Sequence, residues 1–341
     1  MYFFDNDYMI GAHPEVMEQL VATNSLHTVG YGRDEFTQKA KELILKKCGL
    51  REGDVYFLEG GTQSNLVVID RILDYNDGVI AADTAHINVH EAGAIEACGH
   101  KIIALPNKDG KLTHQAIKEY VMSYLNDDTC HYMVRPAMVY ISFPTELGTI
   151  YSLKELKRIR EVCDEFHLPL YIDGARLAYG LASRKNDVTL NDIASSADVF
   201  YIGGTKCGAL FGEAVVTRRP ELLPRFVSLI KLRGATLAKG RLLGVQFLSL
   251  FSNSLYERIG KHAVDMAMLL KEGFMKKGYP LFIDSPSNQQ FFILPNDKIE
   301  SLKKIASFEL WGPKGETSTP VRFVTDWSTV EDEVRALIKA L

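Results

Sequence analysis

Short apolar runs recur through the first two thirds of the chain, separated by segments whose apolar residues fall on one helical face. The apolar runs occupy residues 54–59, 78–82, 101–105, 138–142, 170–173 and 199–202. Between them, the apolar residues from Phe36 to Cys48 repeat with a helical period, and another amphipathic helix follows Ser152, a good helix N-cap. Apolar strands that alternate with amphipathic helices are typical of a mostly parallel sheet with helices on both faces. The pattern therefore predicts an α/β fold.

The pattern changes towards both ends of the chain. Residues 242–276 predict one long helix, broken near Asn253, and residues 279–341 predict a smaller α+β domain. At the other end, Pro14 suits the first turn of the first helix, and the residues before it form an arm. The apolar side chains of Phe3 and Phe4 must pack on their own domain or on a partner subunit. We therefore predict an arm (residues 1–12), a large domain (13–245) and a small domain (246–341).

Composition and charge argue against several classes of protein. The chain has 341 residues, enough for more than one domain, and its net charge of −4 argues against nucleic acid as a main partner. No apolar run approaches the roughly 18–20 residues of a membrane span, and the first residues lack the positive region of a signal peptide. The five cysteines are scattered and lack CxxC spacing, which favours a reducing cytoplasm and no metal cluster.

Two predicted strands end in residues that carry chemistry. One leads through a glycine turn into Lys206, and another ends in Asp173. A lysine at the rim of a packed sheet can be dehydrated, which lowers an ammonium pKa and frees the amine for Schiff-base formation. A lysine after a strand is more often simply solvated. The pair is more informative, because pyridoxal 5′-phosphate needs a carboxylate for its ring nitrogen and an amine for its aldehyde.

Further candidates follow other strands. Gly61 and Thr62 open a helix, where backbone N–H groups and a hydroxyl can hold a phosphate; an ordinary tight turn before a helix is the alternative. His86 could lie over a cofactor ring or move protons, although a lone histidine is more often a plain surface or core residue. Glu146 is a candidate acid or base, although an exposed loop glutamate is commoner. Because open α/β sheets bind ligands beyond the carboxyl ends of their strands, we expect these side chains to meet.

Basic residues in the last third supply candidate anion contacts. The Gly-punctuated segment 231–241 is either a solvated loop or a source of positive charge for a phosphate or carboxylate. Arg322 lies between apolar neighbours inside a predicted strand. A half-buried guanidinium without a partner is costly, so Arg322 should meet a carboxylate, either internal or from a substrate.

With these residues in place, the chain resembles the threonine aldolase branch of the fold type I pyridoxal-phosphate enzymes, which share the aspartate-aminotransferase fold. The resemblance covers essentially the whole chain, in order. The motifs that carry it are Asp5-Asn6-Asp7, Tyr31-Gly32-Arg33-Asp34, Gly60-Gly61-Thr62-Gln63-Ser64-Asn65, Asp83-Thr84-Ala85-His86, Asp173-Gly174-Ala175-Arg176, Thr205-Lys206-Cys207-Gly208 and Arg322-Phe323-Val324-Thr325.

The resemblance implies roles for these residues. Lys206 would form the Schiff base, Asp173 would hold the ring nitrogen, and His86 would stack on the ring. The residues implied in cofactor binding are Gly61, Thr62, His86, Asp173, Arg176, Lys206 and Lys239. The residues implied in substrate binding are Asn6, Tyr31 and Arg322, and those implied in catalysis are Lys206, His86 and Glu146.

The chain departs from the common pattern of the family in three places. Asn6 stands where many members have serine, and Glu146 stands where many have a histidine proposed as a base. The segment that carries a phosphate-binding arginine aligns in more than one way, with Lys239 the first choice, then Arg241 and Arg233. The surroundings of Glu146 and Lys206 are more similar to a phenylserine-aldolase-like subgroup.

The activity implied by the resemblance is cleavage of a β-hydroxy-α-amino acid of the threonine, allo-threonine or phenylserine type. The products would be glycine and an aldehyde, formed through an external aldimine and a quinonoid. The family also implies a homodimer or homotetramer with active sites between subunits.

Three alternatives to this activity remain, one within the same cofactor class and two outside it. A β-eliminating or other C–C lyase would use the same cofactor. A non-catalytic binding protein could keep the fold, although the presence of Lys206, Asp173 and His86 argues against it. A nucleotide-binding protein is disfavoured, because no GxGxxG or GxxxxGK[ST] motif occurs at residues 60–65.

Overall fold

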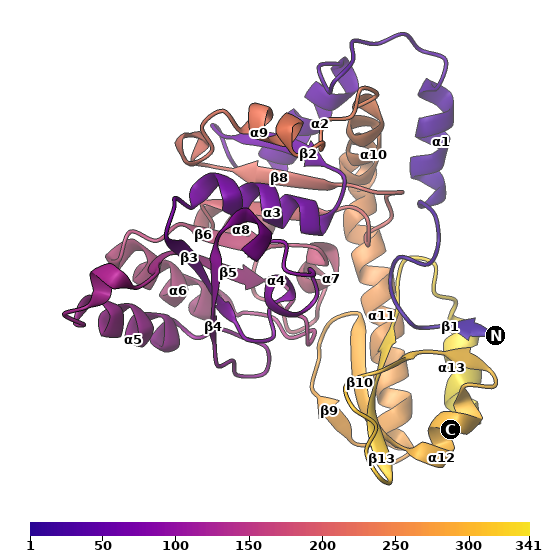
Figure 1. Ribbon diagram of the computed structural model, residues 1–341. Coiled ribbons are helices and arrows are strands. Elements are labelled where there is room, and N and C mark those ends of the chain that lie inside the picture. Colours follow the sequence, from indigo (N-terminus) through magenta and orange to yellow (C-terminus); the bar gives the residue numbers. More distant parts are fainter.

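The computed structural model describes residues 1–341 and contains two bodies, the larger built on a seven-stranded sheet (Figure 1). In spatial order, the strands of this sheet are β2 (Asp54–Leu58), β8 (Glu213–Thr217), β7 (Val199–Gly203), β6 (Leu170–Asp173), β5 (Arg135–Ser142), β3 (Asp77–Ala82) and β4 (Lys101–Leu105). The pairs from β7 to β4 are parallel, and β8 runs antiparallel to both β2 and β7. The predicted mostly parallel α/β sheet is therefore confirmed.

Helices precede, separate and follow these strands. They are α1 (Pro14–Thr23), α2 (Glu35–Lys47), α3 (Gly61–Ile72), α4 (His86–Val89), α5 (His114–Leu125), α6 (Leu153–Glu165), α7 (Leu177–Leu181), α8 (Leu190–Ser196), α9 (Phe226–Leu232), α10 (Arg241–Phe251) and α11 (Leu255–Lys276). Short 3₁₀ turns occupy Glu96–Cys98, Cys130–Tyr132, Pro220–Leu222 and Ser252–Ser254. None of the helices is long and apolar enough to cross a membrane.

Local sequence signals explain several helix boundaries. Ser152 caps α6 in a reciprocal capping box with Glu155, and Pro14 occupies the first turn of α1, as predicted. The predicted break of the long helix is also confirmed, because Asn253 adopts a left-handed φ of 50° between α10 and α11. Asparagine tolerates this conformation better than most residues.

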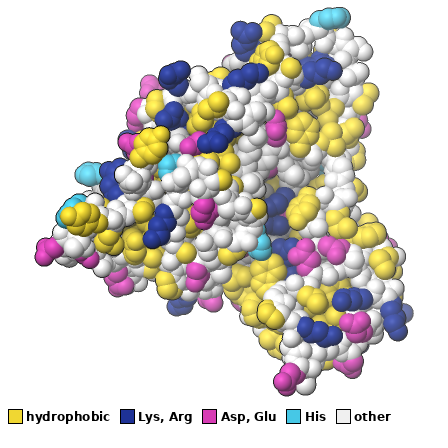
Figure 2. Space-filling view, viewed as in Figure 1, with side chains coloured by type: hydrophobic (Ala, Val, Ile, Leu, Met, Phe, Trp, Pro, Cys, Tyr) yellow, Lys and Arg dark blue, Asp and Glu magenta, His cyan; other side chains and the backbone are white.

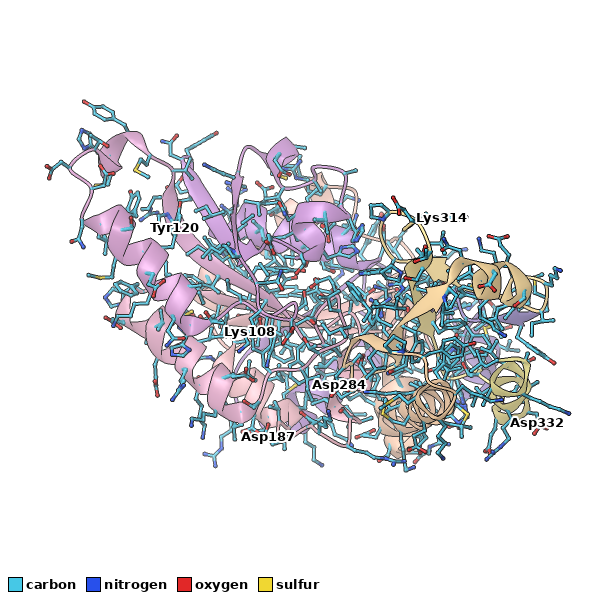
Figure 3. All side chains as sticks on the ribbon, turned by 90° about the horizontal axis from the view of Figure 1, so that it is seen from below. Lys108, Tyr120, Asp187, Asp284, Lys314 and Asp332 are labelled. Atoms are coloured by element: carbon cyan, nitrogen blue, oxygen red, sulfur yellow. The ribbon has the colours of Figure 1, made fainter.

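The smaller body has an antiparallel sheet in the order β12-β13-β10-β9 (Figure 1). Its elements are β9 (Leu281–Ile283), β10 (Gln289–Pro295), α12 (Asn296–Leu302), β12 (Glu309–Leu310), β13 (Ser318–Val324) and α13 (Glu331–Ala340). Seen from below, labelled Lys314 and Asp332 mark this body, and Lys108 and Tyr120 mark the larger one (Figure 3).

The start of the arm packs on the smaller body. β1 (Tyr2–Phe3) pairs in parallel with β11 (Ala306–Ser307), and Phe4 is fully buried against Phe323. Full burial of a phenylalanine contributes about 1.5–3 kcal/mol. Of the two packing sites expected for the arm, the chain's own small domain therefore holds Phe4. Phe3, by contrast, is 59% exposed.

Two hydrophobic cores divide the chain. The larger core takes its residues from Ala12 to Val264, and the smaller one combines Phe4 with residues from Met266 to Leu337. Helix α11 contributes to both cores, so it joins the two bodies rather than marking an edge between them. The boundary between residues 245 and 246 stays a prediction.

Candidate active site

A cavity of about 310 Å³ lies at the carboxyl edge of the central sheet. It brings together seven of the predicted site residues, namely Gly61, Thr62, His86, Glu146, Asp173, Arg176 and Lys206. A neighbouring hollow of about 390 Å³ shares four of them and adds Arg322 from the small domain. The surface is hollowed where the two bodies meet, and Lys, Arg and His side chains gather there (Figure 2). The expected meeting of strand-end residues is therefore observed.

The amine of Lys206 is free to react. Lys206 follows β7 and lines both hollows, and its Nζ has no hydrogen bond or ion pair. Nζ lies 5.9 Å from the ring centre of Tyr8, which comes from the arm. Burial, and then the nearby Arg176, lower the pKa of Lys206, whereas Asp7 and Asp173 oppose this shift. A dehydrated amine with a lowered pKa is a suitable nucleophile for an aldehyde.

Asp173 is a buried carboxylate surrounded by donors. It is 4% exposed, and its Oδ2 accepts hydrogen bonds from the Tyr140 hydroxyl at 2.6 Å and from Asn65 Nδ2 at 3.1 Å. The backbone N–H of Ala175 donates to Oδ1 at 3.0 Å. Burial raises the pKa of Asp173, but hydrogen bonds from Tyr140 and Tyr201 outweigh it, so the pKa lies below its usual value. The carboxylate is thus held ionised at the cavity.

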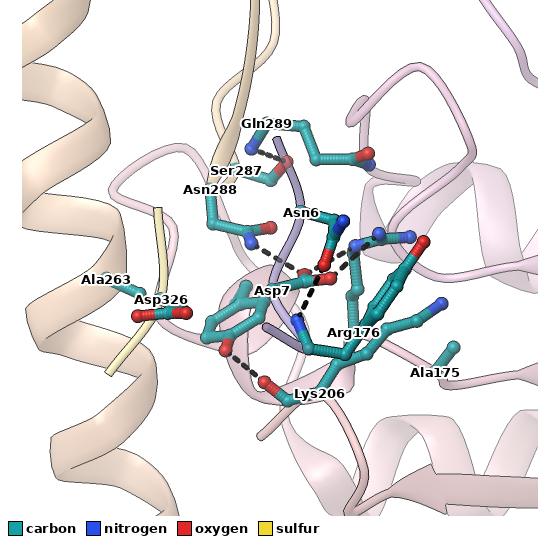
Figure 4. A network of polar contacts seen from close by, with 12 residues as sticks. Asn6, Asp7, Ala175, Arg176, Lys206, Ala263, Ser287, Asn288, Gln289 and Asp326 are labelled. Atoms are coloured by element: carbon teal, nitrogen blue, oxygen red, sulfur yellow. Dashed lines mark hydrogen bonds and ion pairs between the residues drawn. The ribbon is translucent and has the colours of Figure 1, made fainter. Parts of the chain in front are cut away.

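The arm reaches the site through Asp7. Both carboxylate oxygens of Asp7 accept from the Arg176 guanidinium, at 2.7 and 3.0 Å, and Asn288 Nδ2 donates to the same group at 2.9 Å (Figure 4). Burial raises the pKa of Asp7, but Arg176 and Lys206 lower it below its usual value. Removing one partner of such a buried pair typically costs about 3–5 kcal/mol. Asn6 accepts from the Tyr8 N–H and lies in the arm beside Arg176.

Glu146 and His86 are linked to each other and to the sheet. Glu146 Oε1 accepts from the Ser142 hydroxyl at 2.6 Å and from the His86 backbone N–H at 2.9 Å. Burial raises the pKa of Glu146, which brings its proton exchange closer to neutral pH. The His86 ring is held by Glu91, whose Oε1 lies 2.7 Å from Nδ1. Both candidate bases therefore have fixed positions at the cavity.

Arg322 has internal partners. Its guanidinium donates to Gln289 Oε1 at 2.9 Å and pairs with Glu309, and it lies 5.0 Å from the ring centre of Trp311. The side chain is 10% exposed, whereas that of Glu309 is 38% exposed. The carboxylate partner expected for Arg322 is thus Glu309 in this structure.

Three predicted contact residues, Asn6, Tyr31 and Lys239, line neither hollow. Tyr31 is exposed and borders a hollow beside α2, and Lys239 is also exposed. The other two candidates in this segment are engaged elsewhere: Arg233 pairs with Asp70, and Arg241 donates to backbone carbonyls near the end of α1. Of the three candidates, Lys239 is therefore the one whose side chain has no hydrogen bond or ion pair within the chain.

The cavity fits pyridoxal phosphate. Helix α3 begins at Gly61, where a Cβ would lie 3.0 Å from the Tyr201 hydroxyl oxygen, so glycine keeps this approach open. A helix N-terminus with nearby hydroxyls suits a phosphate, and Thr62 and Thr205 line the same cavity. Together with ionised Asp173 and free Lys206, this gives a partner for the cofactor's phosphate, ring nitrogen and aldehyde.

Sequence reasoning missed several residues at the site. Glu213 begins a strand, but β8 is antiparallel, so its start lies opposite Gly203 at the carboxyl edge of β7. Burial raises the pKa of Glu213 to about 8, and its carboxylate accepts from the Gly204 N–H at 2.9 Å. Tyr8, Asn65 and Glu91 were also missed: Asn65 ends a recognised motif without a predicted role, and Tyr8 and Glu91 follow such motifs along the chain.

The fold, the free lysine and the buried aspartate define a pyridoxal-phosphate-dependent lyase of fold type I. The model of the Beta-eliminating lyase family matches residues 6–292, and the chain belongs to this family. The predicted family, cofactor and enzyme class, a pyridoxal-phosphate-dependent aldehyde-lyase, are confirmed.

Individual relatives of known name or structure show which proteins the chain is similar to. A solved structure of Leishmania major threonine aldolase is 41% identical, with a TM-score of 0.96 and coverage of 99% of this chain and 98% of that one. The low specificity L-threonine aldolase of Pseudomonas aeruginosa is 29% identical over 339 residues, which are 98% of this chain and 96% of the relative. A Thermus thermophilus aspartate aminotransferase, 13% identical with a TM-score of 0.73, shares the fold over 100% of this chain and 90% of its own.

Proposed function

We propose that the protein cleaves a β-hydroxy-α-amino acid of the threonine, allo-threonine or phenylserine type to glycine and an aldehyde. The observation that carries this proposal is the free Lys206 amine beside ionised Asp173, with a carboxylate-binding Arg322 in the adjoining hollow. The names of the Leishmania and Pseudomonas relatives support the same reaction.

Each part of the cofactor would have its own partner. Lys206 would bind the aldehyde, Asp173 would pair with the ring nitrogen, and Gly61 and Thr62 would hold the phosphate. Bound pyridoxal phosphate supplies an electron sink for the electron pair released when the Cα–Cβ bond breaks. Asp173 would keep the ring nitrogen protonated, because an adjacent negative charge favours the charged form.

The substrate would enter from the hollow that contains Arg322. Its carboxylate would take the place of Glu309 on the guanidinium, since Glu309 is the more exposed partner and lies on the short strand β12. Arginine binds carboxylates through two parallel hydrogen bonds and so orients the substrate. His86 or Glu146 would then take the β-hydroxyl proton, as both line the two hollows.

Product analysis tests this reaction. The purified protein, reconstituted with pyridoxal phosphate, is incubated separately with threonine, allo-threonine, phenylserine, serine and tyrosine. We expect glycine and the matching aldehyde from at least one of the first three, and a visible absorption change when glycine alone is added. Pyruvate and ammonia from serine or tyrosine, without glycine formation, would instead indicate the β-eliminating alternative.

We also propose that a second copy of the chain completes the site. Exposed apolar side chains gather over the region of α1 and α10 (Figure 2). Between residues 8 and 31, the large exposed apolar residues are Tyr8, Met9, Ile10, Met17, Val21, Leu26, Val29 and Tyr31. Such a patch is typical of a protein interface. Lys239 and Tyr31, which lie outside their own cavity, would then approach the partner's cavity.

A cytoplasmic location stays our expectation, since all five cysteines are free.

Complementation between two defective variants tests the shared site. Lys206→Ala and Lys239→Ala chains are co-expressed with different tags, and the hybrid is purified through both tags. If Lys239 acts in the partner's cavity, the hybrid contains one intact site and is expected to be clearly more active than either parent. A hybrid no more active than the mean of the two parents, or a monomeric and fully active protein, would contradict the proposal.

A further inference from the structure

Glu91 is a buried carboxylate beside the cavity to which the reaction above gives no role. Its side chain is fully buried, and Oε1 lies 2.7 Å from both His86 Nδ1 and Asn65 Nδ2. The second oxygen, Oε2, is buried and has no hydrogen-bond partner. Burying a carboxylate oxygen without a hydrogen-bond partner costs free energy of folding. The two contacts of Oε1 must therefore help to hold the side chains around it.

The orientation of Asn65 follows from its neighbours. Its Nδ2 donates to Glu91 and, at 3.1 Å, to Asp173 Oδ2, while its Oδ1 accepts from the Tyr171 hydroxyl at 3.0 Å. A flipped amide would place its oxygen against two carboxylates, which can only accept. Asn65 is therefore fixed, and its amide hydrogens join the carboxylates of Glu91 and Asp173 in one array.

The same logic fixes the proton of the His86 ring. An ionised carboxylate accepts hydrogen bonds and cannot donate one, so the short contact to Glu91 requires the proton on Nδ1. In the neutral ring, the remaining nitrogen, Nε2, then carries the lone pair, because the hydrogen bond of one ring nitrogen selects the tautomer. No other carboxylate bonds the ring: Glu146 accepts from the backbone N–H of His86 and not from its ring, and the His90 ring lies 5.7 Å away between centres.

We propose that Glu91 is a positioning residue, which holds His86 in the Nδ1–H tautomer and leaves Nε2 as a proton acceptor at the cavity. Asn65 ties this dyad to the Asp173 carboxylate, so the base and the partner of the ring nitrogen share one hydrogen-bonded array. The use of Nε2 as a base rests on the proposed function, whereas the tautomer itself does not.

Nuclear magnetic resonance of the holoenzyme tests the tautomer directly. Long-range proton–nitrogen correlations of nitrogen-15 histidine-labelled protein distinguish the two tautomers, and His86→Asn identifies the signal of His86 among the nine histidines. We expect a protonated Nδ1 and an unprotonated Nε2. A protonated Nε2, alone or together with Nδ1, would overturn the proposal whatever the activity of the enzyme.

Variants separate positioning from simple structural support. Glu91→Gln keeps an oxygen that can accept from both donors, so we expect it to retain the tautomer and most of the activity. Glu91→Ala removes that oxygen, and we expect a mixed tautomer and a kcat lower by roughly 100-fold, the scale of acid–base catalysis, with KM nearly unchanged. The control is Glu96→Gln, which removes the same charge from an exposed site nearby and should behave as wild type.

The remaining outcomes are also decisive. An unchanged His86 tautomer in Glu91→Ala would overturn the proposal, since another group would then hold the ring. If Glu91→Ala does not fold, the wild-type spectrum and the Glu91→Gln variant still decide. The predicted tautomer in a protein that releases no glycine from any substrate would support the role of Glu91 in holding the ring and overturn the proposed function instead.

Discussion

Lys206→Ala is expected to abolish cleavage and to remove the visible band of the bound cofactor. The Lys206 amine is the only one that lines the cavity, and it has no ion pair that another residue could take over. Loss of a residue that forms a covalent bond in catalysis lowers kcat by on the order of 10⁴- to 10⁶-fold. Steady-state assays and absorption spectra of the reconstituted variant measure both effects.

The same variant should remain folded. Burial lowers the pKa of Lys206, so removal of this side chain also removes a desolvated amine that contributes no ion pair to the native state. We expect the thermal midpoint of the apoprotein to be unchanged or slightly higher. Borohydride reduction followed by peptide mass spectrometry should label Lys206 in wild type and nothing in the variant. The matched control, Lys154→Ala on the exposed side of α6, should keep both the band and the label.

An active Lys206→Ala enzyme, or a label on another lysine, would contradict the assignment. The first result would mean that the free amine in the cavity is not used, and the second that the cofactor is bound elsewhere. Loss of the band together with loss of folding would not be explained by covalent chemistry. Circular dichroism of the apoprotein separates these cases.

The sequence was sufficient for the elements whose signals are local. The capping box of Ser152, the proline of α1 and the break at Asn253 depend on neighbours within a few residues, and each was found where expected. The strand-end residues could also be grouped in advance, because parallel strands present their carboxyl ends at one edge. That rule predicts that Lys206 and Asp173 meet, and both line one cavity.

The same rule failed for residues whose position depends on long-range pairing. Glu213 reaches the site only because β8 is reversed between β2 and β7, and nothing in its own sequence marks that reversal. Glu91 is joined to Asn65 across 26 positions. Arg322 obtained its internal partner, Glu309, from the pairing of β12 with β13. Such contacts follow from tertiary packing, which periodicity alone does not specify.

Asp173→Asn is expected to lower kcat by about 10²- to 10³-fold, the scale of losing one preorganised electrostatic partner. The neutral amide keeps the size of the side chain but removes the charge that favours a protonated ring nitrogen. It also turns an amide N–H towards groups that donate to Asp173 Oδ1 or Oδ2, such as Ala175 N, Tyr140 or Asn65. Each donor left unsatisfied costs about 1–3 kcal/mol, so we also expect a lower thermal midpoint.

The direction in which the stability difference changes with pH also follows from the pKa of Asp173. The folded-state pKa of Asp173 lies below its usual value, so the ionised carboxylate stabilises the native state above a pH of about 4, near the unfolded pKa. This contribution disappears as the pH falls through the folded pKa. The difference in stability between wild type and Asp173→Asn should therefore shrink on acidification. A difference that stays constant at low pH would show that the carboxylate is not ionised in the folded protein.

Charge and shape at this position can be separated with a cofactor analogue. An N-methylated pyridoxal phosphate carries a permanent positive ring charge, so it should restore part of the activity of Asp173→Asn while leaving its lowered stability unchanged. Asp128→Asn, which changes an exposed aspartate in the turn after α5, is the control and should match wild type with either cofactor. If the analogue restores nothing although it binds, then Asp173 acts mainly by holding the array of Tyr140 and Asn65 in place. Partial recovery would instead show that its charge acts on the ring nitrogen, because the analogue replaces that effect and no other.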